Sequence, residues 1–350
     1  MFITKKQVYN ALKQVIFFAK KDNIVDLNMI DDIDIKDDEI TIHIIFPKKD
    51  DPAIGIISSS AEKILKTEIS EDIKVSIIPV SEADKGMGPL SGVKNIVAII
   101  AGKGGVGKST IAANLAVSLT KSGKKVGILD ADIMGPSVPM MFGVEGQKPG
   151  VIEREGKAIM LPLENYGVKI LSLGFFVQPN QALMWRGSMI NKAFNQLMAD
   201  SEWGELDYLV IDMPPGTGDI QLTLAQTYNV RGTILVTTPQ KVATADVRRA
   251  AMMYRQDVLT IPLLGIVENM SYFTPLDMPE KKYFIFGKGA TDELASELDI
   301  PVLGRIPIVE KIVETGDNGS PIALDDSSLV TKAFKEIADN VEEQVKNLRN

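Results

Sequence analysis

The feature that most restricts the fold of this chain is a glycine-rich segment between an apolar run and a helical pattern. Residues 102–110 read Gly-Lys-Gly-Gly-Val-Gly-Lys-Ser-Thr and have the spacing of a phosphate-binding loop. Residues 96–101 are apolar throughout, as in a buried parallel strand, and residues 111–119 suit a helix. Strand, loop and helix in this order predict an α/β domain built around a phosphate site.

The loop offers several kinds of contact to a phosphate chain. Its glycines let successive backbone N–H groups point at phosphate oxygens, and the helix N-terminus adds positive potential. We expect Lys108 to bridge the β- and γ-phosphates and the Ser109 hydroxyl to bind Mg²⁺. The predicted nucleotide contacts are Gly102, Lys103, Gly104, Gly105, Val106, Gly107, Lys108, Ser109 and Thr110.

The pattern along the chain predicts two folded parts. Residues 1–80 suit a small α/β domain, with helices over 5–20 and 54–66 and strands over 40–46 and 73–80. Residues 81–93, rich in glycine and small polar residues, suit a linker. Over residues 94–350 strands alternate with helices, which predicts a doubly wound parallel sheet with its ligand at the carboxyl ends of the strands. The expected strands are 96–101, 125–130, 168–173, 207–212, 233–237, 263–268 and 302–306, and an amphipathic helix over 329–348 docks on this domain.

Composition excludes several classes of protein. A net charge of −8 argues against a general nucleic-acid-binding surface. No apolar stretch is long enough to cross a membrane, and the N-terminus lacks the apolar core of a secretory signal, so we expect a cytoplasmic protein. The chain has no cysteine, which excludes disulfides and thiolate metal sites. Its one histidine, His43, lies on the more polar face of an alternating strand pattern, as an ordinary half-exposed residue would.

Two carboxylate motifs stand at the ends of predicted strands. Asp130 and Asp132 are placed to orient an attacking water or to hold Mg²⁺ through its waters. Asp212 ends another buried strand, where we expect it to lie near the metal. The Pro-Pro-Gly-Thr-Gly segment 214–218 then suits a switch that responds to the γ-phosphate through a glycine N–H or Thr217.

Three further residues are candidates for the site. Lys103 either acts on the transferred phosphate, as an arginine finger does, or is a solvated surface lysine. The side-chain amide of Asn269 offers a donor and an acceptor that match the edge of adenine. The loop that ends at Pro307 is able to lie across a purine, so these two strand ends predict a base pocket.

In this order the segments resemble the Mrp/ApbC family of phosphate-loop ATPases, within the deviant Walker A class that includes MinD-type and nitrogenase-iron-protein-type ATPases. The resemblance runs from about residue 94 to the C-terminus, through GKGGVGKST, DADIMGPSVP, MWRG (184–187), DYLVIDMPPGTGDIQLTLAQ, TTPQ (237–240) and VENMSYF (267–273). It implies that Lys103 reaches the partner subunit's nucleotide in an ATP-bound homodimer, that Asp132 positions water and that Asp212 is the Walker B-type residue. It also implies slow ATP hydrolysis and delivery of iron–sulfur clusters to apoproteins. Residues 1–80 are similar to a small domain often fused ahead of such ATPases.

The chain departs from this family where many members carry Cys-x-x-Cys. Residues 274–279 read Thr-Pro-Leu-Asp-Met-Pro at that place, and residues 46–51 of the front domain also lack the cysteine of its relatives. Clusters are normally held by four thiolates, which Asp277 or His43 would replace poorly. Three hypotheses remain: an ATP-driven dimeric switch in cluster assembly whose cluster is ligated by a partner, a regulatory or scaffolding ATPase without a cluster of its own, and a MinD-like positioning ATPase. The acidic composition disfavours the last.

Overall fold

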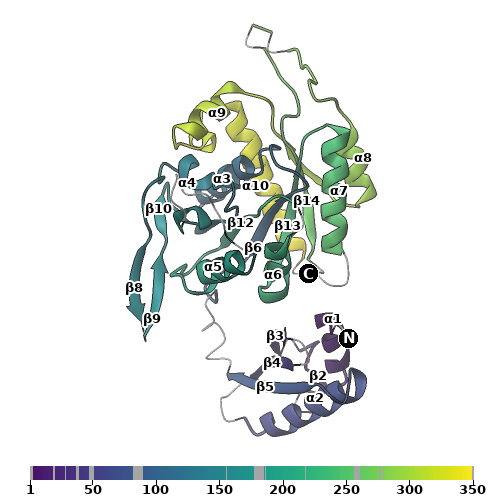
Figure 1. Ribbon diagram of the computed structural model, residues 1–350. Coiled ribbons are helices and arrows are strands. Elements are labelled where there is room, and N and C mark those ends of the chain that lie inside the picture. Colours follow the sequence, from purple (N-terminus) through teal and green to yellow (C-terminus); the bar gives the residue numbers. More distant parts are fainter. Residues whose placement is uncertain are drawn as a thin grey trace. The chain divides into compact units, whose positions relative to one another are not determined.

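The computed structural model describes residues 3–18, 20–27, 29–36, 39–46, 51–81, 90–154, 156–176, 185, 187–216, 218–255, 261–275, 277–278 and 280–348. The chain forms two compact units that divide between Ser91 and Gly92, and each is described by itself (Figure 1). Among the described helices, none is both long and apolar enough to cross a membrane. Residues 82–89 of the expected linker, Met184 and Arg186 of the MWRG motif, and Thr217 lie outside the described residues.

The N-terminal unit is a small sheet that buries one face under helices. Strand β4 is central, antiparallel to β3 and parallel to β5, and its alternate residues Ile40, Ile42 and Ile44 are fully buried. His43 lies between them and is half-buried, as the alternation predicted. The elements are α1 (Lys5–Leu12), β1 (Ile16–Phe17), β2 (Asp22–Asn23), β3 (Ile30–Lys36), β4 (Glu39–Phe46), α2 (Ile54–Glu68) and β5 (Lys74–Ser81).

The helix expected over residues 5–20 is wrong in its second half. Helix α1 ends at Leu12, and the chain then forms β1, which pairs with β2 as a short antiparallel hairpin. Val15 continues the apolar stripe of Val8 and Leu12, but Val15 and Phe17 are both buried outside the helix. Tertiary packing therefore overrides the local helical period at this point.

The second unit is a doubly wound α/β sheet. Its strand order is β10-β11-β7-β12-β6-β13-β14-β15, and every neighbouring pair is parallel except β10 and β11. The strands are β6 (Ile96–Ala101), β7 (Val126–Asp130), β8 (Gly150–Arg154), β9 (Lys157–Leu161), β10 (Leu163–Asn165), β11 (Val168–Ser172), β12 (Tyr208–Asp212), β13 (Val230–Thr237), β14 (Leu263–Glu268) and β15 (Val302–Arg305). The predicted fold class and all seven predicted strands of this domain are confirmed. Strand β10 and the β8–β9 hairpin were not predicted from the sequence.

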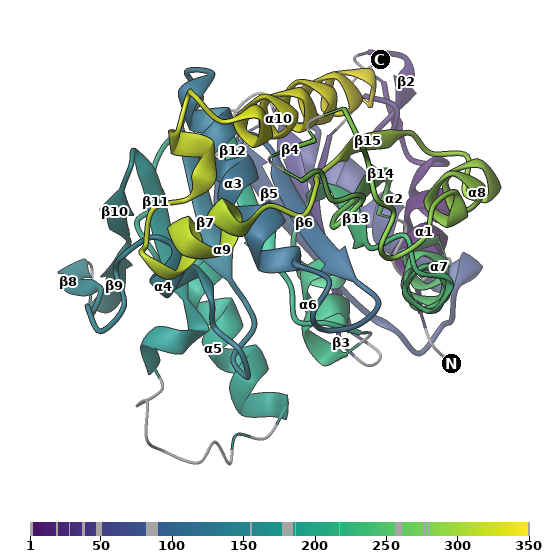
Figure 2. The ribbon, with the colours of Figure 1, turned by 90° about the horizontal axis from the view of Figure 1, so that it is seen from above.

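Helices cover both faces of the sheet, so β6, β7 and β12 are buried along their whole length. In the strand order, the connection from β6 through α3 leads towards the β10 edge, to β7, whereas the connection from β13 through α7 leads towards the β15 edge, to β14. Because both crossovers are right-handed, the two helices lie on opposite faces of the sheet (Figure 2). Helix α10 packs against α3 through a buried stripe, as expected for the C-terminal segment. The helices are α3 (Lys108–Lys121), α4 (Val138–Met141), α5 (Gly187–Ala199), α6 (Asp219–Thr227), α7 (Lys241–Arg255), α8 (Ala290–Glu297), α9 (Glu310–Asp317) and α10 (Leu329–Asn347), with 3₁₀ turns η1 (Leu173–Phe176) and η2 (Ile322–Leu324).

Candidate nucleotide-binding site

The glycine-rich loop joins β6 to the first residue of α3 at the carboxyl edge of the sheet. Two of its glycines are required by close packing. A Cβ on Gly102 would lie 2.2 Å from the carbonyl carbon of Asp246 in α7. Gly107 has a left-handed φ of 83°, and its Cβ would lie 2.1 Å from Nδ2 of Asn269. The loop is thus held between α7 and the end of β14, with the N-terminus of α3 behind it.

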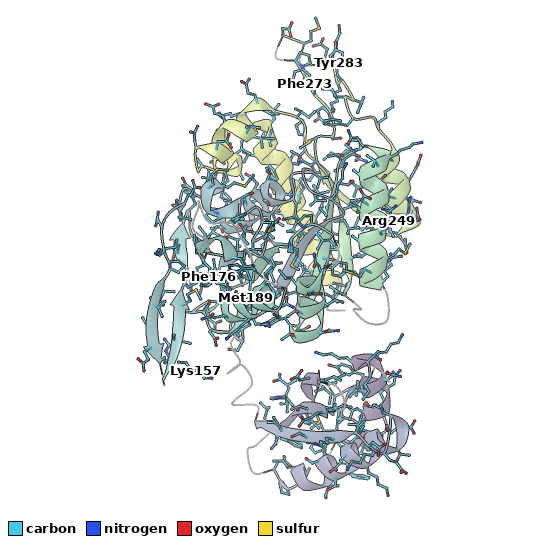
Figure 3. All side chains as sticks on the ribbon, in the orientation of Figure 1. Lys157, Phe176, Met189, Arg249, Phe273 and Tyr283 are labelled. Carbon is cyan, nitrogen blue, oxygen red and sulfur yellow. The ribbon has the colours of Figure 1, made fainter. Side chains whose placement is uncertain are left out.

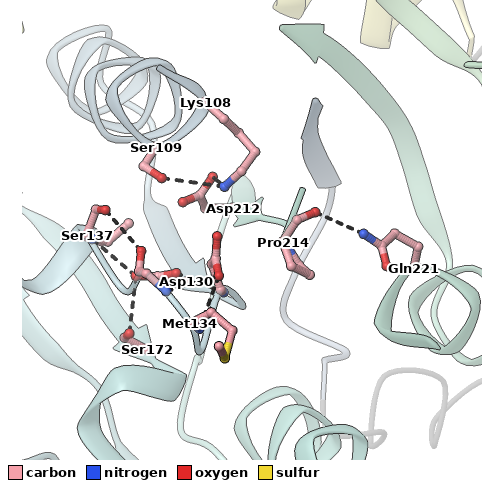
Figure 4. Close-up of polar contacts among 12 residues, drawn as sticks. Lys108, Ser109, Asp130, Met134, Ser137, Ser172, Asp212, Pro214 and Gln221 are labelled. Atoms are coloured by element: carbon pink, nitrogen blue, oxygen red, sulfur yellow. Dashed lines mark hydrogen bonds and ion pairs between the residues drawn. The ribbon is translucent and has the colours of Figure 1, made fainter. Parts of the chain in front are cut away.

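Lys108 and Asp212 form an ion pair beneath this loop (Figure 4). Lys108 Nζ lies 2.5 Å from Asp212 Oδ1 and 3.5 Å from Ser109 Oγ. The two paired side chains are 7% and 0% exposed, and Asp212 Oδ2 is buried with no hydrogen-bond partner. Burial raises the pKa of Asp212 above its ordinary value, against the opposing charge and hydrogen bond of Lys108 and the nearby hydroxyl of Ser109. The pair therefore holds the lysine in place but leaves one carboxylate oxygen unsatisfied.

The unsatisfied oxygen and the neighbouring hydroxyl fit Mg²⁺. Hydroxyl and carboxylate oxygens are ligands that this ion prefers. No group of three His, Cys, Asp or Glu side chains in the described part of the chain could hold a metal by itself, so Ser109 and Asp212 would share the ion with water and phosphate. An iron–sulfur cluster does not fit the donors of this chain, because the sequence contains no thiol.

Asp130 shapes the site from the next strand. It stands beside Asp212 in the β7–β12 register and is fully buried. Its carboxylate accepts N–H groups of Asp132 at 3.0 Å and Val138 at 3.1 Å and the hydroxyl of Ser172 at 3.3 Å (Figure 4). Burial, reinforced by the charge of Asp212, raises the pKa of Asp130, whereas the two backbone donors oppose the rise. Ser172 was not among the predicted site residues, although a polar residue at the end of an apolar strand was a usable signal.

Asp132 occupies a different environment from Asp130. Its Oδ1 accepts the backbone N–H groups of Met134 at 3.2 Å and Gly135 at 3.3 Å, and the residue is half-buried. This turn points the Asp132 carboxylate out of the sheet core, whereas Asp130 faces inward to fasten the loop. Asp130 is thus a structural carboxylate, whereas the carboxylate of Asp132 is available to a ligand.

The segment after Asp212 is held by hydrogen bonds from a glutamine that was not among the predicted site residues. Gln221 in α6 is 1% exposed, and its amide donates to the carbonyls of Pro214 at 2.9 Å and Gly216 at 3.2 Å. Its oxygen accepts the N–H of Gly218 at 2.8 Å, and Gly216 N–H donates to Ala101 at the end of β6. Position three of a helix is where a capping-box glutamine occurs, which was the available signal. The described part of segment 214–218 is therefore tied to the start of the phosphate loop.

The two loops expected to form the base pocket do lie together. Ser271 N–H donates to Ile306 and Ile308 N–H donates to Tyr272, so the loop after β14 is joined to the loop that carries Pro307. Asn269 is 6% exposed, and its amide nitrogen donates to the Val106 carbonyl at 2.9 Å. The donor expected for adenine thus contacts the phosphate loop in this structure, and base recognition stays a prediction. Lys103 and Thr110 lie at the two ends of the loop and are half-buried.

A glycine loop at a helix N-terminus, a buried lysine–aspartate pair and a parallel sheet with helices on both faces define a P-loop NTPase. Residues 92–342 match the family model described as NUBPL iron-transfer P-loop NTPase, and residues 5–77 match the one described as iron–sulfur cluster assembly protein. The chain belongs to this NUBPL-type family, which is the Mrp/ApbC family that its motifs resemble.

Individual relatives agree with this assignment. The chain is 39% identical over 344 residues to an iron–sulfur cluster carrier protein of Synechocystis sp., and the match covers 97% of each protein. A protein of the same name from Aquifex aeolicus is 49% identical over 250 residues, which cover 71% of this chain and 67% of the relative. A nucleotide-binding protein of Archaeoglobus fulgidus, solved in complex with ADP, has 37% identity and a TM-score of 0.59, across 70% of this chain and 93% of that one.

Proposed function

We propose that this chain is an Mg²⁺-dependent ATPase that acts as a nucleotide-driven dimeric switch in the handling of iron–sulfur clusters. The observation that carries the nucleotide part is the Lys108–Asp212 pair beneath the glycine loop, with one oxygen of Asp212 unsatisfied. A lysine in that position can exchange a carboxylate for a phosphate without leaving the site. The solved relative bound to ADP supports the same proposal.

In this proposal the phosphates lie on the backbone of residues 102–110, and Ser109, Asp132 and Asp212 hold Mg²⁺ directly or through water. Bound Mg²⁺ would neutralise charge on the phosphates. Asp132 orients a water molecule whose oxygen bonds to the γ-phosphorus as the bond to the β–γ bridging oxygen breaks. ADP leaves with the bridging oxygen, and the protons of the water stay on the released phosphate or pass to solvent. Lys108, and Lys103 contributed across a homodimer, stabilise the charge that develops on the transferred group. Asn269 and Pro307 flank the adenine.

Kinetics of Lys103→Ala test the role assigned to that lysine. An interaction made only in the transition state lowers turnover more than ground-state binding. We therefore expect phosphate release to fall by about a hundredfold, while the calorimetric affinity for Mg·ATP changes little. Lys148→Ala, an exposed lysine elsewhere in the unit, is the control. Equal losses of affinity and turnover in Lys103→Ala would contradict the role.

The cargo is proposed from the relatives and not from the donors in this chain. Relatives named iron–sulfur cluster carrier proteins match nearly the whole chain, and the N-terminal unit matches an assembly-protein family. With no cysteine present, a cluster handled here takes its thiolates from a cluster-assembly partner or an apoprotein. The chain then supplies the nucleotide-driven change of assembly, and its partner supplies the ligands.

Anaerobic measurement of cluster transfer tests whether the chain supplies only the nucleotide-driven step and its partner supplies the cluster ligands. Iron and sulfide reconstitution of the chain alone should leave no bound iron after gel filtration. Mixed with a cluster-loaded scaffold protein and an apo-ferredoxin, the chain should speed the rise of ferredoxin absorbance when Mg·ATP is present. Ser109→Ala should remove that acceleration, because the metal-binding hydroxyl is lost. An unchanged transfer rate with and without the chain would overturn the cluster role and leave the ATPase proposal standing.

The absence of cysteine favours a second candidate, a regulatory or scaffolding ATPase without cluster chemistry. Such a protein would bind its partners in a nucleotide-dependent way but would not change transfer rates. A pull-down with the wild type and Lys108→Ala, each with and without Mg·ATP, separates the two when combined with the transfer assay. Partners retained equally under all conditions would contradict a switch of either kind.

A further inference from the structure

The segment that follows β12, residues 214–218, lies beside the strand that leads into the phosphate loop. Gly216 N–H donates to the carbonyl of Ala101 at 3.2 Å, and Ala101 is the end of β6, directly before Gly102. An N–H group donates more strongly to a charged phosphate oxygen than to an amide carbonyl. A γ-phosphate held on the loop would therefore compete with Ala101 for this N–H, whereas ADP offers no such group.

The side-chain amide of Gln221 holds the backbone of this segment at three points. Its Nε2 donates to the carbonyls of Pro214 at 2.9 Å and Gly216 at 3.2 Å, and its Oε1 accepts the N–H of Gly218 at 2.8 Å (Figure 4). Both hydrogens of the amide NH₂ are thus used. Gln221 is 1% exposed, so its partners are held in a place that bulk water does not reach.

Helix capping explains only one of these three contacts. Gln221 is the third residue of α6, where a glutamine or a glutamate commonly accepts the N–H of the N-cap residue, here Gly218. The bonds to the carbonyls of Pro214 and Gly216 reach outside the helix and need an NH₂ group, which glutamate lacks. These two donors therefore act on the segment and not on the helix end.

The two carbonyls belong to the peptide units on either side of the one that carries the Gly216 N–H. Because a peptide unit is planar, a hydrogen bond to its carbonyl orients the whole unit. Gly216 has a left-handed φ of 90°, and a glycine restricts rotation less than any other residue does. The bonds from Gln221 therefore fix the orientation of an N–H group that would otherwise turn about a flexible residue.

We propose that Gln221 is a positioning residue for recognition of the γ-phosphate, an inference that rests on the proposed ATPase function. The side chain acts through the Gly216 N–H and does not itself contact the nucleotide. With the segment already ordered, ATP loses little free energy in ordering it on binding. ADP binds on residues 102–110 without using the segment. Removal of the two amide donors should therefore weaken ATP binding selectively.

Calorimetry of Gln221→Glu tests the two donors. Glutamate keeps an oxygen for the Gly218 N–H, and so keeps the helix cap, but it loses the NH₂ group that holds the two carbonyls. With Mg²⁺ present, affinity for adenylyl imidodiphosphate, an ATP analogue that is not hydrolysed, should fall by about tenfold, while ADP affinity changes by less than about twofold. Gln221→Met removes the donors without adding a charge and should show the same selective loss.

Two methionine substitutions serve as controls. Gln226→Met makes the same change at an exposed position of α6, and Lys157→Met alters an exposed residue of the β8–β9 hairpin, which Figure 3 labels away from α6. Neither should alter the affinity for either nucleotide. Retained ADP binding shows that a variant is folded, and where Gln221→Met unfolds, the cap-preserving Gln221→Glu decides.

Three results would contradict the proposal in different ways. Wild-type affinities in Gln221→Glu would mean that helix capping is the whole role of the glutamine. Equal weakening of both nucleotides in variants that circular dichroism shows to be folded would mean a structural role only. Either result overturns the inference and leaves the ATPase proposal standing. A wild type that binds neither nucleotide would refute the ATPase proposal itself, and the inference with it.

Discussion

Replacing Lys108 with methionine should destabilise the second unit, which contains the phosphate loop and which we call the ATPase unit, even when no nucleotide is added. Methionine keeps much of the length of the side chain but removes the charge that pairs with Asp212, whose carboxylate is fully buried and already lacks a partner for Oδ2. Removing one member of a buried ion pair costs about 3–5 kcal/mol, because the other charge is left uncompensated. We expect a loss of that order in the free energy of unfolding near neutral pH.

The loss should depend on pH in a defined direction. Asp212 has a raised pKa in the folded wild type despite the lowering effect of Lys108, so its pKa rises further when Lys108 is removed. A carboxyl group whose folded pKa exceeds its unfolded value stabilises the fold at low pH and does so less as the pH rises towards the folded pKa. Between the folded pKa values of wild type and variant, the deficit should grow by about 1.4 kcal/mol per pH unit. It is therefore smaller in acid than in base.

Urea unfolding followed by tryptophan fluorescence measures this deficit. Trp185 and Trp203 are the two tryptophans of the chain, both belong to the ATPase unit, and Trp203 is 1% exposed. The N-terminal unit is therefore silent in the assay. Lys103→Met makes the same chemical change at a half-buried position of the same loop and should shift stability by less than about 1 kcal/mol. A Lys108→Met deficit no larger than this, or one that shrinks as the pH rises, would refute the reasoning.

Three further substitutions test the surroundings of the loop. Gly107→Ala forces a Cβ to within 2.1 Å of Asn269 Nδ2 at a left-handed φ, so calorimetric nucleotide affinity should fall by about tenfold or more. Asn269→Ala leaves the buried Val106 carbonyl without its hydrogen-bond donor, which costs about 1–3 kcal/mol of folding free energy and should lower the melting temperature. An unchanged melting temperature would mean that water replaces the amide. Asp130→Asn replaces one of the two accepting oxygens with an NH₂ group, so at least one of the three hydrogen-bond donors around Asp130 then faces another donor. Thermal unfolding should therefore show a loss of about 1–3 kcal/mol in the free energy of unfolding. A neutral effect at Asp130 would show that its carboxylate does not fasten the Asp132 loop.

The large sheet could be predicted because its strands carry their own signal. Strands such as β6 and β12 are buried on both faces, so each is a short apolar run that stands out from its surroundings. Strand β8 gives no such signal, because every one of its residues is exposed. Strand β9 does carry a short apolar run over residues 158–161, which was not recognised as a strand. In the N-terminal unit the opposite error arose, since Val15 fitted a helical stripe with Val8 and Leu12 but is buried after the end of α1.

Part of the candidate site could likewise be predicted from the sequence, and part of it could not. The phosphate loop is a local motif whose residues are adjacent in sequence, so its members could be named in advance. The partners that organise it come from distant segments: Ser172 fastens Asp130, and Gln221 clamps the carbonyls of Pro214 and Gly216. Those contacts depend on how β7, β11 and α6 meet in space, which no local pattern contains. For the same reason the sequence could not separate the inward-facing Asp130 from Asp132.

The Lys108–Asp212 pair also implies that nucleotide and metal bind cooperatively. A triphosphate that draws Lys108 away leaves Asp212 as an unpaired buried charge, and the carboxylate must then gain a cation or a proton. Removing Mg²⁺ with a chelator should therefore weaken ATP binding strongly in the wild type, and should make the remaining binding tighter at lower pH, where Asp212 is protonated. In Asp212→Asn no charge is left behind, so ATP affinity should depend much less on Mg²⁺ and on pH. Calorimetry of both proteins with and without the metal decides the point, and an identical Mg²⁺ dependence in the two would show that Asp212 does not couple the ligands.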